Sequence, residues 1–139
     1  MSAARAIRIL VVDDEADLIA TYRRLFHRHG YDVTSAATRA GGLLLIDSSP
    51  PDLIITDLEL PDGDGLDLVR AAREASSISR VIVVSGRSSR GAQEDALAAG
   101  ASAFVAKPVS ADALRELVQS LLEHPRPDTG RRDSNVPLR

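Results

Sequence analysis

Three short runs of almost wholly apolar residues limit what this chain can fold into. They lie at residues 7–12 (IRILVV), 53–55 (LII) and 80–84 (RVIVV), and each is followed at once by polar residues. Runs of valine, isoleucine and leucine without polar alternation are typical of strands that are buried on both faces inside a parallel sheet. A chain with such strands must place helices on both faces of the sheet to cover them.

Helical segments and two weaker strands fill the spaces between these runs. The weaker strands are expected at residues 31–36 and 101–106. Apolar residues at helical spacing, with capping residues before them, predict helices at 17–29, after Thr38, at 65–75, at 88–99 from Ser88 or Ser89, and after Ser110. Five strands that alternate with five helices predict a parallel sheet joined by right-handed crossovers.

Two of these helices are expected to be weakly held. Gly41 and Gly42 lie inside the second helix, where each glycine is less favourable than alanine by about 1 kcal/mol. Leu97 is the single large apolar residue of the 88–99 helix, so little apolar surface anchors that helix to the rest of the domain.

Composition narrows the class of protein. The chain has 139 residues, enough for one domain, and its formal net charge of −3 argues against a nucleic-acid surface as its main working face. It has no cysteine, which excludes disulfides and cysteine-based metal sites. No apolar run is long enough to span a membrane, and the first residues lack a signal-peptide cleavage pattern, so we expect a cytoplasmic protein. We expect one domain at residues 5–123 and a disordered tail at residues 124–139, where periodicity ends.

Polar side chains follow four of the five predicted strands. Asp13 and Asp14 follow the first strand, Asp57 the third, Ser85 the fourth and Lys107 the fifth. The carboxyl ends of parallel strands meet at one edge of the sheet, and folds of this class place their ligand sites there. We therefore expect these five side chains to converge on one cleft.

The expected cleft suits a divalent cation. Three carboxylates in one cleft raise one another's pKa values, and a bound cation removes that cost. Oxygen-only ligands suit Mg²⁺, which binds through one or two carboxylates together with phosphate oxygens. A carboxylate nucleophile, a metal, a lysine and a hydroxyl group together favour phosphoryl transfer.

The motifs at these strand ends resemble those of the receiver domain of two-component response regulators. They are VVDDE at 11–15, DLELPDGDG at 57–65, VSG at 84–86 and FVAKP at 104–108, and the resemblance covers residues 7–122 in order. It implies an α/β fold of the (βα)5 flavodoxin-like type, with a doubly wound five-stranded parallel sheet and helices on both faces.

The resemblance implies a role for each residue of the cleft. Asp57 is the expected phosphoacceptor, and Lys107 lies beside it and forms a bond with the next proline that is commonly cis in the family. Asp14 is expected to bind Mg²⁺ directly, and Asp13 largely through water. The third protein ligand of the metal is expected to be the backbone carbonyl of Glu59.

The resemblance also implies a switch and two residues that tune it. The switch hydroxyl falls on Ser85, where threonine is commoner, and the switch aromatic falls on Phe104, where tyrosine is commoner. The phenylalanine ring can pivot but has no hydroxyl to donate. Glu59 and Arg87 lie two residues past Asp57 and Ser85, and they are expected to tune the lifetime of the phosphorylated state.

The function implied by the resemblance is that of a single-domain response regulator, a signalling switch that assists its own phosphorylation and dephosphorylation rather than an enzyme. A sensor histidine kinase or a histidine phosphotransfer protein would phosphorylate Asp57 in the presence of Mg²⁺. The modification would change a face formed by the 88–99 helix, the 101–106 strand and the last helix, which would bind a downstream target protein. The residues after the domain, about 16 of them, are too few for a DNA-binding module, so we expect no direct DNA binding.

Two alternatives remain open on sequence. One is a receiver-like interaction module that is never phosphorylated, although such a module would not need the complete polar set. The other is a phosphatase of the haloacid-dehalogenase type, with Asp57 as nucleophile and Glu59 as general acid. The acidic stretch at 62–65 is interpreted as a turn, because the calcium loop it resembles would put Leu60 and Ala71 at ligand positions.

Overall fold

The structure, a computed structural model, describes residues 5–76, 78–86 and 90–123. Its sheet strands are β1 (Arg8–Val12), β2 (Asp32–Ala36), β3 (Leu53–Thr56), β6 (Arg80–Ser85) and β7 (Ala103–Ala106). Its helices are α1 (Ala16–Arg28), α2 (Arg39–Ser48), α3 (Leu66–Ala75), α4 (Arg90–Ala99) and α5 (Ala111–Glu123). Arg87, the predicted helix starts at Ser88 and Ser89, and the predicted tail lie outside the described residues.

The strands form one parallel sheet in the order β2-β1-β3-β6-β7. The chain runs outward from β1 to β2, returns past β1 to β3, and then continues outward through β6 to β7. This doubly wound order confirms the predicted fold class. The direction of winding changes between β1 and β3, which is the point where folds of this kind bind their ligands.

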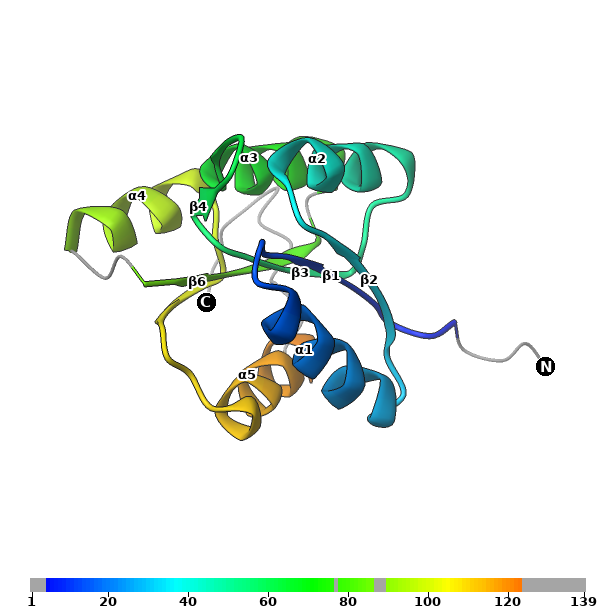
Figure 1. Ribbon diagram of the computed structural model, residues 1–139. Helices are drawn as coiled ribbons and strands as arrows, with labels where there is room; N and C mark the ends of the chain where they lie inside the picture. The colour runs from blue at the N-terminus through cyan, green and yellow to red at the C-terminus, as the bar shows by residue number, and fades with distance from the viewer. Residues whose placement is uncertain (1–4, 77, 87–89, 124–139) are drawn as a thin grey trace, which may run out of the picture.

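Helices cover both faces of the sheet. Figure 1 shows α2, α3 and α4 on one face and α1 and α5 on the other. Because strand residues alternate between the faces, Leu10 and Ile54 pack under α2 and α3, whereas Ile9 and Ile55 pack against α1 and α5. Every residue of β3 is buried, as the unbroken apolar run predicted.

Side-chain caps set the starts of two helices as the sequence predicted. Thr38 Oγ1 accepts a hydrogen bond of 3.0 Å from the backbone N–H of Gly41 at the start of α2. Ser110 Oγ accepts one of 3.0 Å from the N–H of Ala113 at the start of α5. Each cap satisfies a backbone donor that the helix itself leaves without a partner.

Packing in two helices differs from what their sequences indicated. A Cβ atom on Gly42 would lie 3.0 Å from Leu68 and 3.1 Å from Val12, so this glycine allows α2 to approach α3 and the sheet closely. The expectation of a loose α2 did not take that contact into account. In α4 the buried residues are Ala92 and Ala96, and Leu97 remains 44% exposed. Even less large apolar surface anchors α4 than the sequence suggested.

One element was not predicted. A two-stranded antiparallel hairpin, β4 (Glu59–Leu60) and β5 (Gly63–Asp64), follows β3 directly. Two residues per strand are too few to produce a readable apolar pattern. Within the described residues, no helix has both the length and the apolarity that a membrane crossing would need.

Candidate functional site

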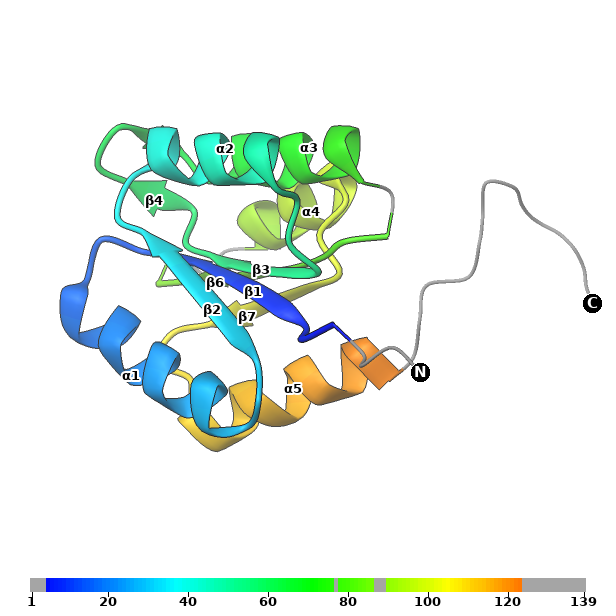
Figure 2. The same cartoon turned by 90° about the vertical axis from the view of Figure 1, so that its right-hand side faces the viewer.

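Three carboxylates meet where β1 and β3 end. Asp13 and Asp14 follow β1. The N–H of Asp57 donates to the carbonyl of Val12 at 3.1 Å, which keeps strands β1 and β3 paired to their ends. One carboxylate oxygen from each of the three aspartates lies within 4.8 Å of the other two. The cluster lies at the edge of the sheet where the chain passes from β1 to α1, on the left in Figure 2.

Lys107 joins this cluster from β7. Its Nζ atom lies 2.9 Å from Oδ2 of Asp57 and 3.0 Å from Oδ2 of Asp13, with Oε1 of Glu15 at 3.5 Å. The backbone N–H of Lys107 donates to the carbonyl of Ser85 at 2.9 Å, and the bond to Pro108 is cis. The structure thus brings together the lysine and the three aspartates that the sequence placed at strand ends.

The charges of the cluster do not balance. Burial raises the pKa of Asp13 above its ordinary value, and repulsion from Asp57 adds to that effect, whereas hydrogen bonds from Glu15 and Lys107 oppose it. Burial would lower the pKa of Lys107, but its hydrogen bonds to Asp57 and Asp13 outweigh burial and raise that pKa. One ammonium group faces several carboxylates, so the site favours a further positive charge.

The donor set fits Mg²⁺. The clustered atoms are all carboxylate oxygens, which are hard ligands of the kind that this ion prefers. Asp13 is 3% exposed, whereas Asp14 is exposed, so the cluster has one buried and one open side. Mg²⁺ usually retains several waters, and an open side leaves room for them.

The Asp57 carboxylate has a fixed orientation. The backbone N–H of Glu59 donates to its Oδ1 at 3.2 Å, while Lys107 binds Oδ2. The residue is 8% exposed, at the start of the loop that leads into β4. A carboxylate held at both oxygens, at the rim of an acidic cluster, can present one oxygen to an incoming electrophile with little reorganisation.

The predicted switch residues lie on the two strands beyond β3. Ser85 is fully buried at the end of β6. Phe104 in β7 pairs in register with Val83 and is partly buried in the core under α4, against the cluster that includes Ala92 and Ala96. Glu59 is exposed.

Comparison with known proteins identifies the family. The family model described as "Response regulator receiver domain" matches residues 9–119. The chain belongs to this family. A receiver domain of this kind is a signalling domain of two-component systems rather than a conventional enzyme.

Individual relatives agree with the assignment. The chain is 41% identical over 110 residues to "TorCAD operon transcriptional regulatory protein TorR" of Escherichia coli O157:H7, which covers 79% of this chain and 46% of the relative. It is 38% identical over 104 residues to "Transcriptional regulatory protein KdpE" of Mycobacterium tuberculosis, covering 75% of this chain and 46% of the relative. The receiver thus spans about half the length of these curated relatives. The expectations of a single-domain protein and of no direct DNA binding therefore stay predictions.

Solved structures give the same fold. A receiver domain protein from Methanospirillum hungatei JF-1 superimposes with a TM-score of 0.83 at 32% identity, covering 86% of this chain and 95% of that one. A receiver domain protein from Clostridium thermocellum gives a TM-score of 0.75 at 27% identity, covering 82% and 92%.

Two features of this receiver site were missed on sequence. Glu15 lies near Lys107, and an exposed glutamate after two aspartates gives no sign of that contact. Gly65 packs against the backbone of Asp57, so closely that a Cβ atom there would lie 2.0 Å from the Asp57 carbonyl oxygen. Its backbone is an ordinary helical one, with φ −65° and ψ −15°, so no turn signal in the sequence marks it.

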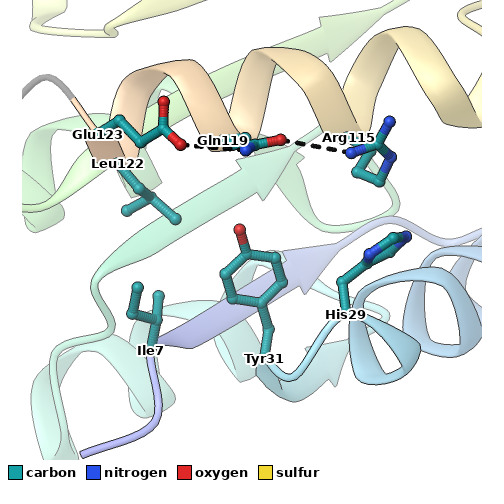
Figure 3. Close-up of a pocket in the computed structure, with 7 residues that line it drawn as sticks. All are labelled: Ile7, His29, Tyr31, Arg115, Gln119, Leu122 and Glu123. Carbon is teal, nitrogen blue, oxygen red and sulfur yellow. Dashed lines mark hydrogen bonds between the residues drawn. The ribbon is translucent and has the colours of Figure 1, made fainter. Parts of the chain in front are cut away.

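A separate pocket lies at the opposite edge of the sheet. Ile7 and Tyr31 precede β1 and β2, and the Tyr31 hydroxyl points toward α5, where Gln119 hydrogen-bonds to Arg115 and Glu123 at 3.4 and 3.0 Å (Figure 3). The pocket has a volume of about 370 Å³ and contains none of the predicted site residues; it is lined by Ile7, His29, Tyr31, Arg115, Gln119, Leu122 and Glu123.

Proposed function

We propose that this receiver accepts a phosphoryl group on Asp57 from a phosphohistidine of a sensor histidine kinase or a histidine phosphotransfer protein. A carboxylate oxygen of Asp57 attacks phosphorus, the phosphorus–nitrogen bond to the donor breaks, and the imidazole leaves with the electron pair. The observation that carries the proposal is the buried Asp57 carboxylate, bonded to Lys107 at 2.9 Å inside an acidic cluster.

Lys107 and the Glu59 backbone support this transfer by orientation and charge. Lys107 stays beside the acceptor because Asp13 holds the same ammonium group at 3.0 Å. A fixed positive charge at the acceptor offsets negative charge on the transferred group, and it needs no reorganisation during the step. The Glu59 N–H keeps the carboxylate from turning away.

Asp13, Asp14, Asp57 and the backbone carbonyl of Glu59 would hold Mg²⁺. When bound, the ion supplies positive charge that offsets the charge on the phosphoryl oxygens. Asp14 is the proposed direct ligand and Asp13 the one that acts largely through water.

The output of the proposed switch runs through Ser85, Phe104 and α4. The buried Ser85 hydroxyl would turn toward the phosphoryl oxygens, and the Phe104 ring would move into the space it leaves. Phe104 packs in the core beneath α4, whose buried anchors are only alanines, so a small shift of the ring can alter how α4 sits. The face of α4, β7 and α5 would then bind the target protein.

Hydrolysis of the aspartyl phosphate would reset the switch. Glu59 and Arg87 are proposed to tune its rate, because they flank the path of the attacking water in the family that this chain resembles. The role of Arg87 is proposed from the sequence, because this residue lies outside the described part of the chain. We also predict that the protein is located in the cytoplasm.

Acetyl-phosphate labelling tests the proposal. We expect a single Mg²⁺-dependent phosphoryl adduct by intact mass in the wild type, no adduct in Asp57→Asn, and an undiminished adduct in Asp47→Asn, which removes an exposed carboxylate of α2. No adduct in the wild type would favour the interaction module that is never phosphorylated. Sustained release of phosphate from a small phosphate ester would favour the phosphatase.

A further inference from the structure

The start of α2 depends on a residue from outside the helix. An α-helix leaves its first four N–H groups without helical partners. Here the N–H of Gly42 makes the first helical bond, to the carbonyl of the N-cap residue Thr38 at 3.0 Å, and the N–H of Gly41 before it binds the Thr38 hydroxyl. The N–H groups of Arg39 and Ala40, in the first turn of the helix, donate to the two carboxylate oxygens of Asp62 at 2.7 and 2.9 Å.

Asp62 lies in the turn between β4 and β5, so these two bonds tie the hairpin to α2. The backbone donors of Ala40 and Arg39 hold the pKa of Asp62 below its ordinary value, as expected of a carboxylate that accepts N–H groups at a helix N-terminus. Figures 1 and 2 show β4 beside α2 and α3, above the end of the sheet that carries the acidic cluster.

A second set of contacts holds the same hairpin. The Arg39 side chain passes close to Gly63, where a Cβ atom would lie 2.7 Å from Arg39 Cδ. Arg39 Nε then donates to Oδ2 of Asp67 in α3 at 2.8 Å. Arg39 thus crosses the hairpin and joins α2 to α3, and Asp62 fixes the turn beneath it.

The hairpin begins at the residue that orients the acceptor. Glu59 is the first residue of β4, and its N–H binds Oδ1 of Asp57. Leu60 packs in the core and the N–H of Gly65 donates to the carbonyl of Leu58 at 2.7 Å, which holds the base of the hairpin, whereas residues 61–64 are exposed. Burial does little to hold the turn, so the two hydrogen bonds to Asp62 add the contacts that fix this end of the hairpin.

We propose that Asp62 is a positioning residue for the phosphoryl site: by capping α2 it fixes the β4–β5 hairpin, and so the backbone of Glu59 beside Asp57. This inference rests on the proposed function, because it assigns Asp62 a role toward the Mg²⁺ that Asp57 and the Glu59 carbonyl would bind. Asp62 itself touches neither the metal ligands nor the reacting atoms.

The test uses two variants at Asp62 and one matched control at the same helix end. Asp62→Ala removes both acceptors and the charge. Asp62→Asn removes the same charge but keeps one carbonyl oxygen as an acceptor. Thr38→Ala removes the other side-chain cap of α2 without touching the hairpin.

Two readouts are made on the unphosphorylated protein: amide hydrogen exchange by NMR, and an Mg²⁺ titration followed by the amide shift of Glu59. In Asp62→Ala we expect the Arg39 and Ala40 amides to exchange at least about fivefold faster. We expect the apparent dissociation constant for Mg²⁺ to rise about tenfold, the lower end of the effect of groups that orient metal ligands. Thr38→Ala should speed exchange at Gly41 and leave Mg²⁺ affinity within about twofold of the wild type, and Asp62→Asn should fall between Asp62→Ala and the wild type.

Each contrary outcome has a distinct meaning. Equal Mg²⁺ affinities for Asp62→Asn and Asp62→Ala would show that only the charge matters, which overturns the positioning role. An equal loss in Thr38→Ala would assign the effect to the stability of α2 and overturn it as well. If the wild type and Asp62→Ala bind Mg²⁺ equally well, the positioning role of Asp62 is wrong, and the proposed function is unaffected. A wild type that neither binds Mg²⁺ nor accepts phosphate contradicts the proposed function itself.

Discussion

Replacement of Gly65 by alanine should disturb Asp57 although the mutated residue carries no functional group. A Cβ atom at this position would lie 2.0 Å from the carbonyl oxygen of Asp57 and 3.0 Å from its carbonyl carbon. Non-bonded heavy atoms prefer a separation of about 3.5 Å, so the two segments must move apart by at least about 1 Å. The obstacle is backbone rather than a flexible side chain, and the helical φ and ψ of Gly65 exclude a backbone-strain explanation.

That displacement should lower both the stability of the protein and the rate at which Asp57 is labelled. Overpacking of this kind costs about 1–3 kcal/mol of the free energy of unfolding. A shift of about 1 Å at a reacting group can slow its reaction roughly 100-fold, so acetyl-phosphate labelling of Asp57 should slow by up to that factor. Urea unfolding followed by circular dichroism measures the first effect, and the initial rate of adduct formation by intact mass measures the second.

Gly91→Ala is the matched control. Gly91 lies in α4 with nothing within 4 Å of a built Cβ atom, so the same substitution there should stabilise the protein by roughly 0.5–1 kcal/mol. Gly65→Ala and Gly91→Ala should therefore move stability in opposite directions. If Gly65→Ala unfolds at the wild-type urea concentration and labels at the wild-type rate, the close contact with Asp57 does not constrain the site and the reasoning is wrong.

Two further predictions concern metal binding and pH. Mg²⁺ at 100 times its dissociation constant should raise the free energy of unfolding by about 2.7 kcal/mol if it binds only the folded state. Asp14→Asn should lose most of that gain. Equal stabilisation of both proteins by Mg²⁺ in thermal melts would count against Asp14 as a ligand. The folded pKa of Asp13 is raised above its ordinary value of 3.8, so the native state binds this proton more tightly than the unfolded state, and stability due to Asp13 is lost as pH rises through the folded pKa. Asp13→Asn should accordingly gain melting temperature relative to the wild type as the pH rises above the ordinary value of 3.8, whereas parallel curves would show that the pKa of Asp13 is not raised by folding.

Much of the fold followed from local patterns. The apolar runs that became β1, β3 and β6 could only be strands covered on both faces, and Thr38 and Ser110 cap α2 and α5 as their residue types indicated. Once the sheet is parallel, Asp13, Asp57 and Lys107 lie at the same edge, because all strand carboxyl ends lie there, and the lysine side chain reaches both aspartates. Strand composition and helix caps depend on neighbouring residues, so both can be inferred from the sequence.

Other features depended on the tertiary structure. The two bonds from Asp62 join residues more than 20 positions apart, and nothing near Asp62 in sequence distinguishes a helix cap from an ordinary turn. Gly42 and Gly65 are required by close approaches of other segments, and Leu97 is exposed because Ala92 and Ala96 occupy the inner side of α4. The sequence by itself determined which elements form and which polar residues end the strands, since both depend on local composition. How closely the elements approach, and which distant groups satisfy the donors at a helix end, depends on contacts between segments that exist only after the chain has folded.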